Sequence, residues 1–212
     1  DGLHGWGEAT TVFSDATVLG ALEDLREFVI GMDPTRIEEL WSNRFYRTIF
    51  HGPAFYSALA GIEHALWDIT GKSLGVPVHE LLGGAIFDRV RAYANTWFLG
   101  ANTADEYAAK AAAVVADGWD ALKFDPLPGS MMAATTAELD VAVDRVRAVR
   151  EAVGPDVDIL IECHGRLSPE SGIRFADALG ELRPFWIEEP IPAHNPLAMR
   201  RVREHTDIPV AC

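Results

Sequence analysis

Apolar residues recur at helical spacing through the first third of the chain. They follow a polar start at residues 14–15 and lie three or four positions apart, at Val18, Leu22, Leu25 and Val29. Pro34 and Pro53 indicate the starts of two further helices, because proline fits the first helical turn, where its missing N–H is not needed. Residues 3–10 predict one strand without visible partners. Residues 1–84 are therefore expected to form an incomplete α+β domain.

After residue 84 the pattern alternates between short apolar strands and longer helices. Strands are predicted at residues 90–95, 119–125, 158–164, 185–189 and 208–211. Helices are predicted between them, at residues 104–116, 137–153, 169–179 and 196–205. This alternation indicates parallel strands with right-handed crossovers, in either a barrel or an open doubly wound sheet.

The barrel is favoured for two reasons. No glycine-rich phosphate loop follows the first strand, and polar residues gather at the carboxyl ends of strands, where barrel enzymes carry their chemistry. Residues 85–212 would then supply four βα units and the start of a fifth strand. A half-barrel leaves strand edges and core open, so the chain is expected to be truncated.

Two neighbouring strands end in carboxylates. Because side chains alternate along a strand, Glu162 and His164 share one face, and the other face is purely apolar at Ile159, Ile161 and Cys163. We expect the apolar face to pack against helices. On the next strand only one of Glu188 and Glu189 can join Glu162.

Buried carboxylates need a cation, and these two are interpreted as ligands of Mg²⁺, which prefers oxygen. Zinc would recruit more nitrogen or sulfur. The alternative is that each glutamate is solvated or paired with Arg166 or Arg183. One strand earlier, Lys123 and Asp125 share a face, and Lys123 is predicted to reach the same pocket. An ion pair between Lys123 and Asp125 remains equally open.

Composition narrows the function classes. The 212 residues are 49% hydrophobic and 24% charged, as in a folded globular protein. A net charge of −14 disfavours nucleic-acid binding. No apolar run is long enough to span a bilayer, so no membrane partner is expected. Two cysteines, Cys163 and Cys212, exclude a disulfide framework and favour a reducing cytoplasm.

Three segments together resemble a known family. The sequence FWIEEP at residues 185–190 resembles a barrel strand of the enolase superfamily, in its mandelate racemase/muconate lactonizing enzyme branch. The segment from residue 52 to residue 84, with GIEHALWDI and ELLGG, resembles the last helices of that branch's capping domain, and GWGEA at residues 5–9 resembles a capping strand. The resemblance covers almost the whole chain.

The resemblance implies a partial (β/α)7β TIM-like barrel with an incomplete α+β capping domain. It also implies Mg²⁺ bound by acids that end the third, fourth and fifth strands, which are Glu162, Glu188 and an acid beyond Cys212. Members of this branch remove the proton next to a substrate carboxylate and stabilise an enediolate. The base of the later strands would also lie outside this chain.

Two departures from the family pattern favour a dehydratase. Racemases and lactonizing enzymes carry Lys-x-Lys where this chain has Lys123-Phe124-Asp125. Residues 162–166, ECHGR, resemble the D-x-H-G/H-R segment of galactonate- and mannonate-type dehydratases, with glutamate in place of aspartate. That resemblance implies that His164 is the general acid for the departing hydroxyl, a role suited to imidazole near neutral pH.

The resemblance thus implies a magnesium-dependent lyase that dehydrates a sugar acid to a 2-keto-3-deoxy acid. His164 and Lys123 are the predicted catalytic residues, and the predicted substrate contacts are His51, Trp97, Asp125 and Arg166. For Trp97 a core position is the alternative. A homo-oligomer is also expected. The alternatives in function are a racemase, epimerase or cycloisomerase of the same branch, and a non-catalytic fragment or binding module.

Overall fold

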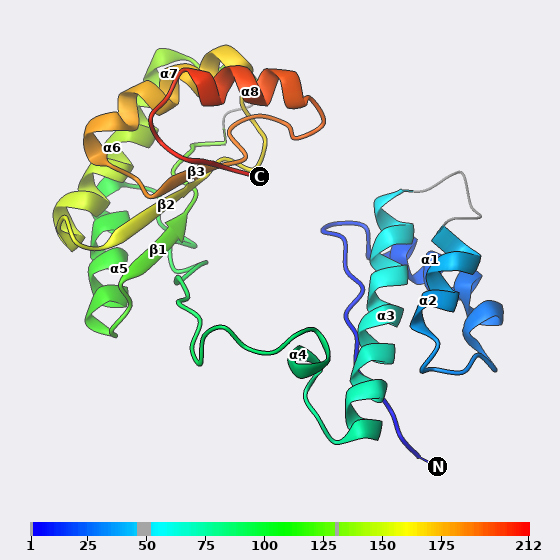
Figure 1. The fold of residues 1–212 in the computed structure, drawn as a ribbon. Coiled ribbons are helices and arrows are strands. Elements are labelled where there is room, and N and C mark those ends of the chain that lie inside the picture. The colour runs from blue at the N-terminus through cyan, green and yellow to red at the C-terminus, as the bar shows by residue number, and fades with distance from the viewer. Residues whose placement is uncertain (1, 46–51, 130–131) are drawn as a thin grey trace. The chain divides into compact units, whose positions relative to one another are not determined.

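The computed structural model describes residues 2–45, 52–129 and 132–212, shown as a ribbon in Figure 1. His51, predicted as a substrate contact, lies outside the described residues. The chain divides into two compact units, Asp1–Arg89 and Val90–Cys212. Among the described residues, no helix combines the length and apolar character needed to cross a membrane.

The first unit is built from helices. They are α1 (Asp15–Val29), α2 (Ile37–Leu40), the π-helical turn Trp41–Phe45, α3 (Pro53–Leu74) and α4 (Val78–Leu81). The core between α1 and α3 contains Val18, Leu25, Leu59 and Leu66, all 5% exposed or less. The helices predicted from residue 14 and from Pro53 are confirmed. The helix predicted at Pro34 begins three residues later, because Asp33 first forms a turn by accepting a hydrogen bond from the Thr35 N–H at 2.9 Å.

The strand predicted at residues 3–10 is wrong, because the structure gives these residues neither helix nor strand. The segment instead packs against α3 through glycines: a Cβ atom on Gly7 would lie 1.8 Å from the Gly61 carbonyl oxygen. The Trp6 N–H donates to Asp68 Oδ2 at 2.8 Å. Since a strand needs a neighbour for its hydrogen bonds and none of the described residues supplies one, contact with the helix determines this conformation.

The second unit alternates helices and parallel strands. In chain order they are α5 (Ala104–Ala116), β1 (Ala121–Phe124), α6 (Thr136–Val153), β2 (Asp158–Glu162), α7 (Pro169–Leu179), the 3-10 turn Gly180–Leu182, β3 (Trp186–Glu188), α8 (Pro196–Glu204) and β4 (Val210–Ala211). The sheet order is β1-β2-β3-β4, with every pair parallel. The strand predicted at residues 90–95 is reduced to a bridge between Ala94 and Leu122.

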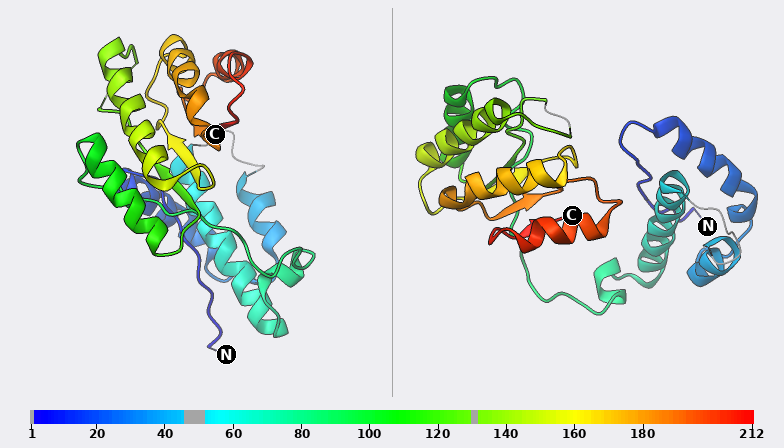
Figure 2. Two further views of the ribbon diagram at one scale, coloured as in Figure 1. Left: turned by 90° about the vertical axis from the view of Figure 1, so that its left-hand side faces the viewer. Right: turned by 90° about the horizontal axis from the view of Figure 1, so that it is seen from above.

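This strand order distinguishes the two predicted architectures. An open doubly wound sheet reverses its strand order at a switch point, where its ligands bind. Here each strand lies beside the next one in the chain, and the helices lie on one side of the sheet (Figures 1 and 2). The second unit is therefore a partial barrel wall, as the sequence predicted.

The helix-facing side of the sheet is apolar. Phe124 of β1, Ile159 and Ile161 of β2, and Cys163 just after it are each 0% exposed and share one core with residues of α5, α6 and α7. The prediction that the apolar set of β2 faces the helices is confirmed. Threonine capping boxes at Thr103 and Thr135 begin α5 and α6, because each side chain accepts the N–H of a glutamate three residues later.

Candidate active site

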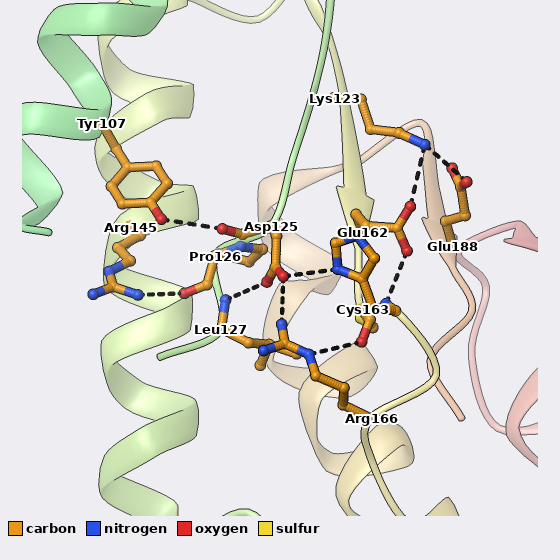
Figure 3. Close-up of polar contacts among 11 residues, drawn as sticks. Tyr107, Lys123, Asp125, Pro126, Leu127, Arg145, Glu162, Cys163, Arg166 and Glu188 are labelled. Atoms are coloured by element: carbon orange, nitrogen blue, oxygen red, sulfur yellow. Dashed lines mark hydrogen bonds and ion pairs between the residues drawn. The ribbon is translucent and has the colours of Figure 1, made fainter. Parts of the chain in front are cut away.

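The other face of the sheet brings together Lys123 of β1, Glu162 of β2 and Glu188 of β3. Glu162 and Glu188 are partners in the β2–β3 register. Lys123 Nζ lies 3.1 Å from Glu162 Oε2 and 2.8 Å from Glu188 Oε1 (Figure 3). Lys123 therefore reaches the pocket, as predicted, and forms ion pairs with the two glutamates. The alternative of a Lys123–Asp125 pair is not what the structure contains.

Burial and charge oppose each other in this cluster. Lys123 is 8% exposed and Glu162 is 7% exposed. Burial acts to lower the pKa of Lys123, but hydrogen bonds to Glu188 and Glu162 outweigh it and raise this pKa above its ordinary value. Burial likewise acts to raise the pKa of Glu188, but the hydrogen bond and the charge of Lys123 lower it overall. Lys123 is thus a cation at neutral pH, which does not suit it to accept a proton.

Further donors hold the two carboxylates. Glu162 Oε1 accepts the His164 backbone N–H at 2.8 Å, and Glu188 Oε2 accepts the Trp186 indole N–H at 3.0 Å. The ring of Tyr93 lies 5.3 Å from Lys123 Nζ, a cation–π contact. Hydrogen bonds therefore orient both carboxylates toward the ammonium group of Lys123.

The donor set can be compared with what a metal requires. Two neighbouring carboxylates that converge on one cation fit Mg²⁺, which takes oxygen ligands and commonly keeps several waters. Within the described part of the chain, no three His, Cys, Asp or Glu side chains are grouped closely enough to hold a metal ion. The carboxylates of Glu162 and Glu188 therefore fit Mg²⁺ by their donor chemistry.

A second polar network lies beside the first. Asp125 Oδ2 is 2.9 Å from His164 Nδ1 and also forms an ion pair with Arg166 Nη2. The second oxygen, Oδ1, accepts the Leu127 N–H at 2.9 Å. Arg166 Nε donates to the Cys163 carbonyl at 3.2 Å (Figure 3). The structure therefore brings Asp125, His164 and Arg166 together at the carboxyl ends of β1 and β2.

The backbone turns sharply at these strand ends. His164 has φ 51° and Glu189 has φ 40°, in the left-handed region that non-glycine residues rarely adopt. Such conformations cluster at functional sites. The turn at His164 directs its N–H to the Glu162 carboxylate. The turn after Glu188 follows the residue that the register places opposite Glu162, so Glu188 rather than Glu189 faces the cluster.

A cavity of about 400 Å³ opens over the two networks. Lys123, Asp125, Glu162 and His164 line it, together with loop residues Asn95, Thr96, Phe98 and Leu99. Trp97 is not among the lining residues and packs in the helix-facing core, 5.2 Å from Phe124 between ring centroids. Sequence reasoning missed Asn95 and Thr96, although two polar residues at the carboxyl end of a predicted strand were a usable signal.

Family models match nearly the whole chain. Residues 1–83 match the mandelate racemase / muconate lactonizing enzyme N-terminal domain, and residues 106–212 match the enolase C-terminal domain-like family. Curated relatives include D-gluconate dehydratase of Thermoproteus tenax, 39% identical over 100% of this chain and 43% of that protein. D-galactonate dehydratase of Ralstonia pickettii is also 39% identical, over 100% of this chain and 55% of that protein. The chain thus spans about half the length of these relatives.

Solved structures give the same result. A member of the enolase superfamily from Salmonella Typhimurium superimposes with a TM-score of 0.91 at 33% identity, over 97% of this chain and 59% of that one. A mandelate racemase/muconate lactonizing enzyme-like protein from Rubrobacter xylanophilus gives 0.86 at 37% identity, over 97% and 59%. By sequence and by fold, the chain belongs to the mandelate racemase / muconate lactonizing enzyme family, with an enolase C-terminal-like domain.

Proposed function

We propose that the whole enzyme containing this chain is a magnesium-dependent lyase that dehydrates a sugar acid to a 2-keto-3-deoxy acid. The observation that carries the proposal is the position of His164, which lines the same cavity as Lys123 and Glu162. The names of the two dehydratase relatives support an aldonate such as gluconate or galactonate as substrate.

Glu162 and Glu188 are the proposed metal ligands within this chain. When bound, Mg²⁺ supplies positive charge that stabilises negative charge developing on a substrate carboxylate. In the metal-free protein, hydrogen bonds to both glutamates raise the pKa of Lys123. Its proposed role is therefore electrostatic: it offsets the charge of the two carboxylates and adds positive potential at the cavity wall.

His164 is proposed to act as the general acid. During dehydration the C–H bond next to the carboxylate breaks and its proton goes to a base outside this chain. The C–O bond of the neighbouring hydroxyl also breaks, and the imidazolium proton joins the hydroxyl, which leaves as water. The enol that results takes up a proton to give the 2-keto-3-deoxy acid.

The racemase or epimerase alternative requires a second base at the end of β1. In racemases of the family the second lysine of Lys-x-Lys supplies this base. Here the same position is Asp125, whose carboxylate contacts Arg166, His164 and the Leu127 N–H. This engagement favours dehydration over racemisation.

The test is a product assay of the whole enzyme with D-gluconate and D-galactonate in the presence of Mg²⁺. The parent enzyme should form a 2-keto-3-deoxy acid. The substitution His164→Asn should lower kcat by roughly 100- to 10,000-fold, the usual contribution of a general acid, while Mg²⁺ affinity is kept. His205→Asn is the matched control, because the His205 ring contacts the Arg201 carbonyl at the end of α8 and does not line this cavity. Unchanged turnover in the His164 variant, or an epimer as product, would refute the proposal.

A further inference from the structure

Both carboxylate oxygens of Asp125 are already engaged by other groups of the protein, which argues against a simple substrate contact. Its side chain is 14% exposed, against 58% for the side chain of His164. Three groups contact its two oxygens: the Leu127 N–H on Oδ1, and Arg166 Nη2 and His164 Nδ1 on Oδ2. A carboxylate has about four acceptor sites, so most of its capacity is used by the protein itself.

The donors around Asp125 determine the direction of the hydrogen bond to His164. The Leu127 N–H and the Arg166 guanidinium are donors only, so both Asp125 oxygens act as acceptors. The imidazole nitrogen that faces the same carboxylate must then donate. This requires the proton of a neutral His164 to be on Nδ1, because the two ring nitrogens of neutral histidine have opposite roles.

We propose that Asp125 is a positioning residue for His164. It accepts the Nδ1–H, fixes the tautomer and orientation of the ring, and leaves Nε2 as the nitrogen that exchanges a proton with a ligand in the cavity. The inference rests on the proposed function for its catalytic meaning, although the tautomer itself does not depend on it.

Arg166 makes this arrangement rigid. Its Nη2 pairs with Asp125, and its Nε donates to the Cys163 carbonyl at 3.2 Å, one residue before His164. The Arg166 side chain is 19% exposed. The Arg166 guanidinium therefore connects the Asp125 carboxylate, just after β1, with the turn after β2 that carries the His164 ring. These two contacts fix the distance between Asp125 and His164. Arg166 is assigned to Asp125 rather than to the substrate.

The two possible roles of Asp125 predict different results. A substrate contact would, when altered, raise KM and leave the ring of His164 unchanged. A positioning residue would, when altered, lower kcat, leave KM nearly unchanged and shift the tautomer of His164. The substitution Asp125→Asn separates these outcomes, since the amide keeps the size of the side chain and can present an N–H₂ group to Nδ1.

The first measurement is ¹⁵N NMR of the histidine rings above their titration range. The sequence has seven histidines, and the signals that disappear in His164→Gln are assigned to His164. In the parent protein Nδ1 should carry the hydrogen and Nε2 should be bare. In Asp125→Asn the Nε2–H form should gain population. A parent protein with the hydrogen on Nε2 would overturn the inference without any variant.

The second measurement is steady-state kinetics of the whole enzyme. Asp125→Asn should lower kcat by roughly 100- to 10,000-fold, in line with the loss of an aspartate that orients a catalytic histidine. Asp120→Asn is the matched control, since Asp120 lies just before β1 and pairs with Arg91 at 3.2 Å. A raised KM with normal kcat overturns the positioning role. If the parent enzyme dehydrates no sugar acid, the proposed function fails, but the NMR result still decides the role of Asp125.

Discussion

The two faces of the barrel sheet carry different chemistry on the same strands. On the helix-facing side, Leu122, Phe124 and Ile187 are fully buried among apolar side chains. On the opposite side, Lys123 and Glu162 are almost as buried but charged. Neighbouring residues on one strand thus have different roles. The apolar side chains stabilise the fold because they are removed from water, whereas the charged side chains stay ionised because they form ion pairs.

The difference follows from what burial does to each group. A fully buried large apolar side chain contributes about 1.5–3 kcal/mol. A buried ion pair gains little net stability, because desolvation offsets most of the attraction, but removal of one partner is strongly destabilising. The apolar face should therefore respond to lost volume, and the charged face to pH and to cations.

The largest expected effect is on the apolar face. Phe124→Ala should lower the free energy of unfolding by about 3–5 kcal/mol, because it leaves a cavity among α5, β1 and the neighbouring strands. Denaturant unfolding measures this change. Phe185→Ala is the matched control, since Phe185 is 48% exposed and its loss should matter much less. Equal losses for the two variants would contradict the assignment of faces.

A second test removes the cation from the charged face. Lys123→Met keeps the length of the side chain but leaves Glu162 and Glu188 without their shared partner, so the free energy of unfolding should fall by about 3 kcal/mol without divalent metal. Added Mg²⁺ should stabilise this variant more than the parent, which thermal unfolding with and without MgCl₂ would show. Lys72→Met is the control, because its pair with Asp68 is partly exposed and of small value. If Mg²⁺ stabilised the parent and Lys123→Met equally, the inference that Mg²⁺ and Lys123 interact with the same two carboxylates would be wrong.

The smallest expected effect is on acid stability. The folded pKa of Glu188 is lowered from 4.5, so this group contributes stability that is present above about pH 4.5 and lost as pH falls through its folded pKa. Glu188→Gln should flatten that part of the curve of unfolding free energy against pH. Phe185→Ala, on the same strand region, should keep the parent's slope. An unchanged slope in Glu188→Gln would show that Lys123 does not hold Glu188 in the folded state.

Local signals predicted the helices well. The α5 helix was expected at residues 104–116 and is found at Ala104–Ala116, and α7 was expected at 169–179 and is found at Pro169–Leu179. The reason is that capping residues and proline act within one turn of the helix end. The strands were predicted too long, because a strand ends where its neighbour ends, and the neighbour is distant in sequence.

The partners of the charged residues were the least predictable part of the site. Residue spacing placed Lys123, Asp125, Glu162 and His164 at strand ends, but left open which cation would meet which carboxylate. Strand register decides this, because it places Glu162 beside Glu188 and both within hydrogen-bond distance of Lys123. Asp125 instead contacts His164 and Arg166. A slip of one residue would turn every one of these side chains to the other face.

The sequence by itself therefore determined the helices of the second unit, the alternation of faces and the residues available for chemistry, because each depends on spacing along a few turns or strand residues. Only the tertiary structure decided that Lys123 joins two glutamates, that Trp97 packs in the helix-facing core, and that residues 3–10 lie on a helix instead of forming a strand. Each of these depends on contacts between segments far apart in the chain, whose distances local spacing does not contain.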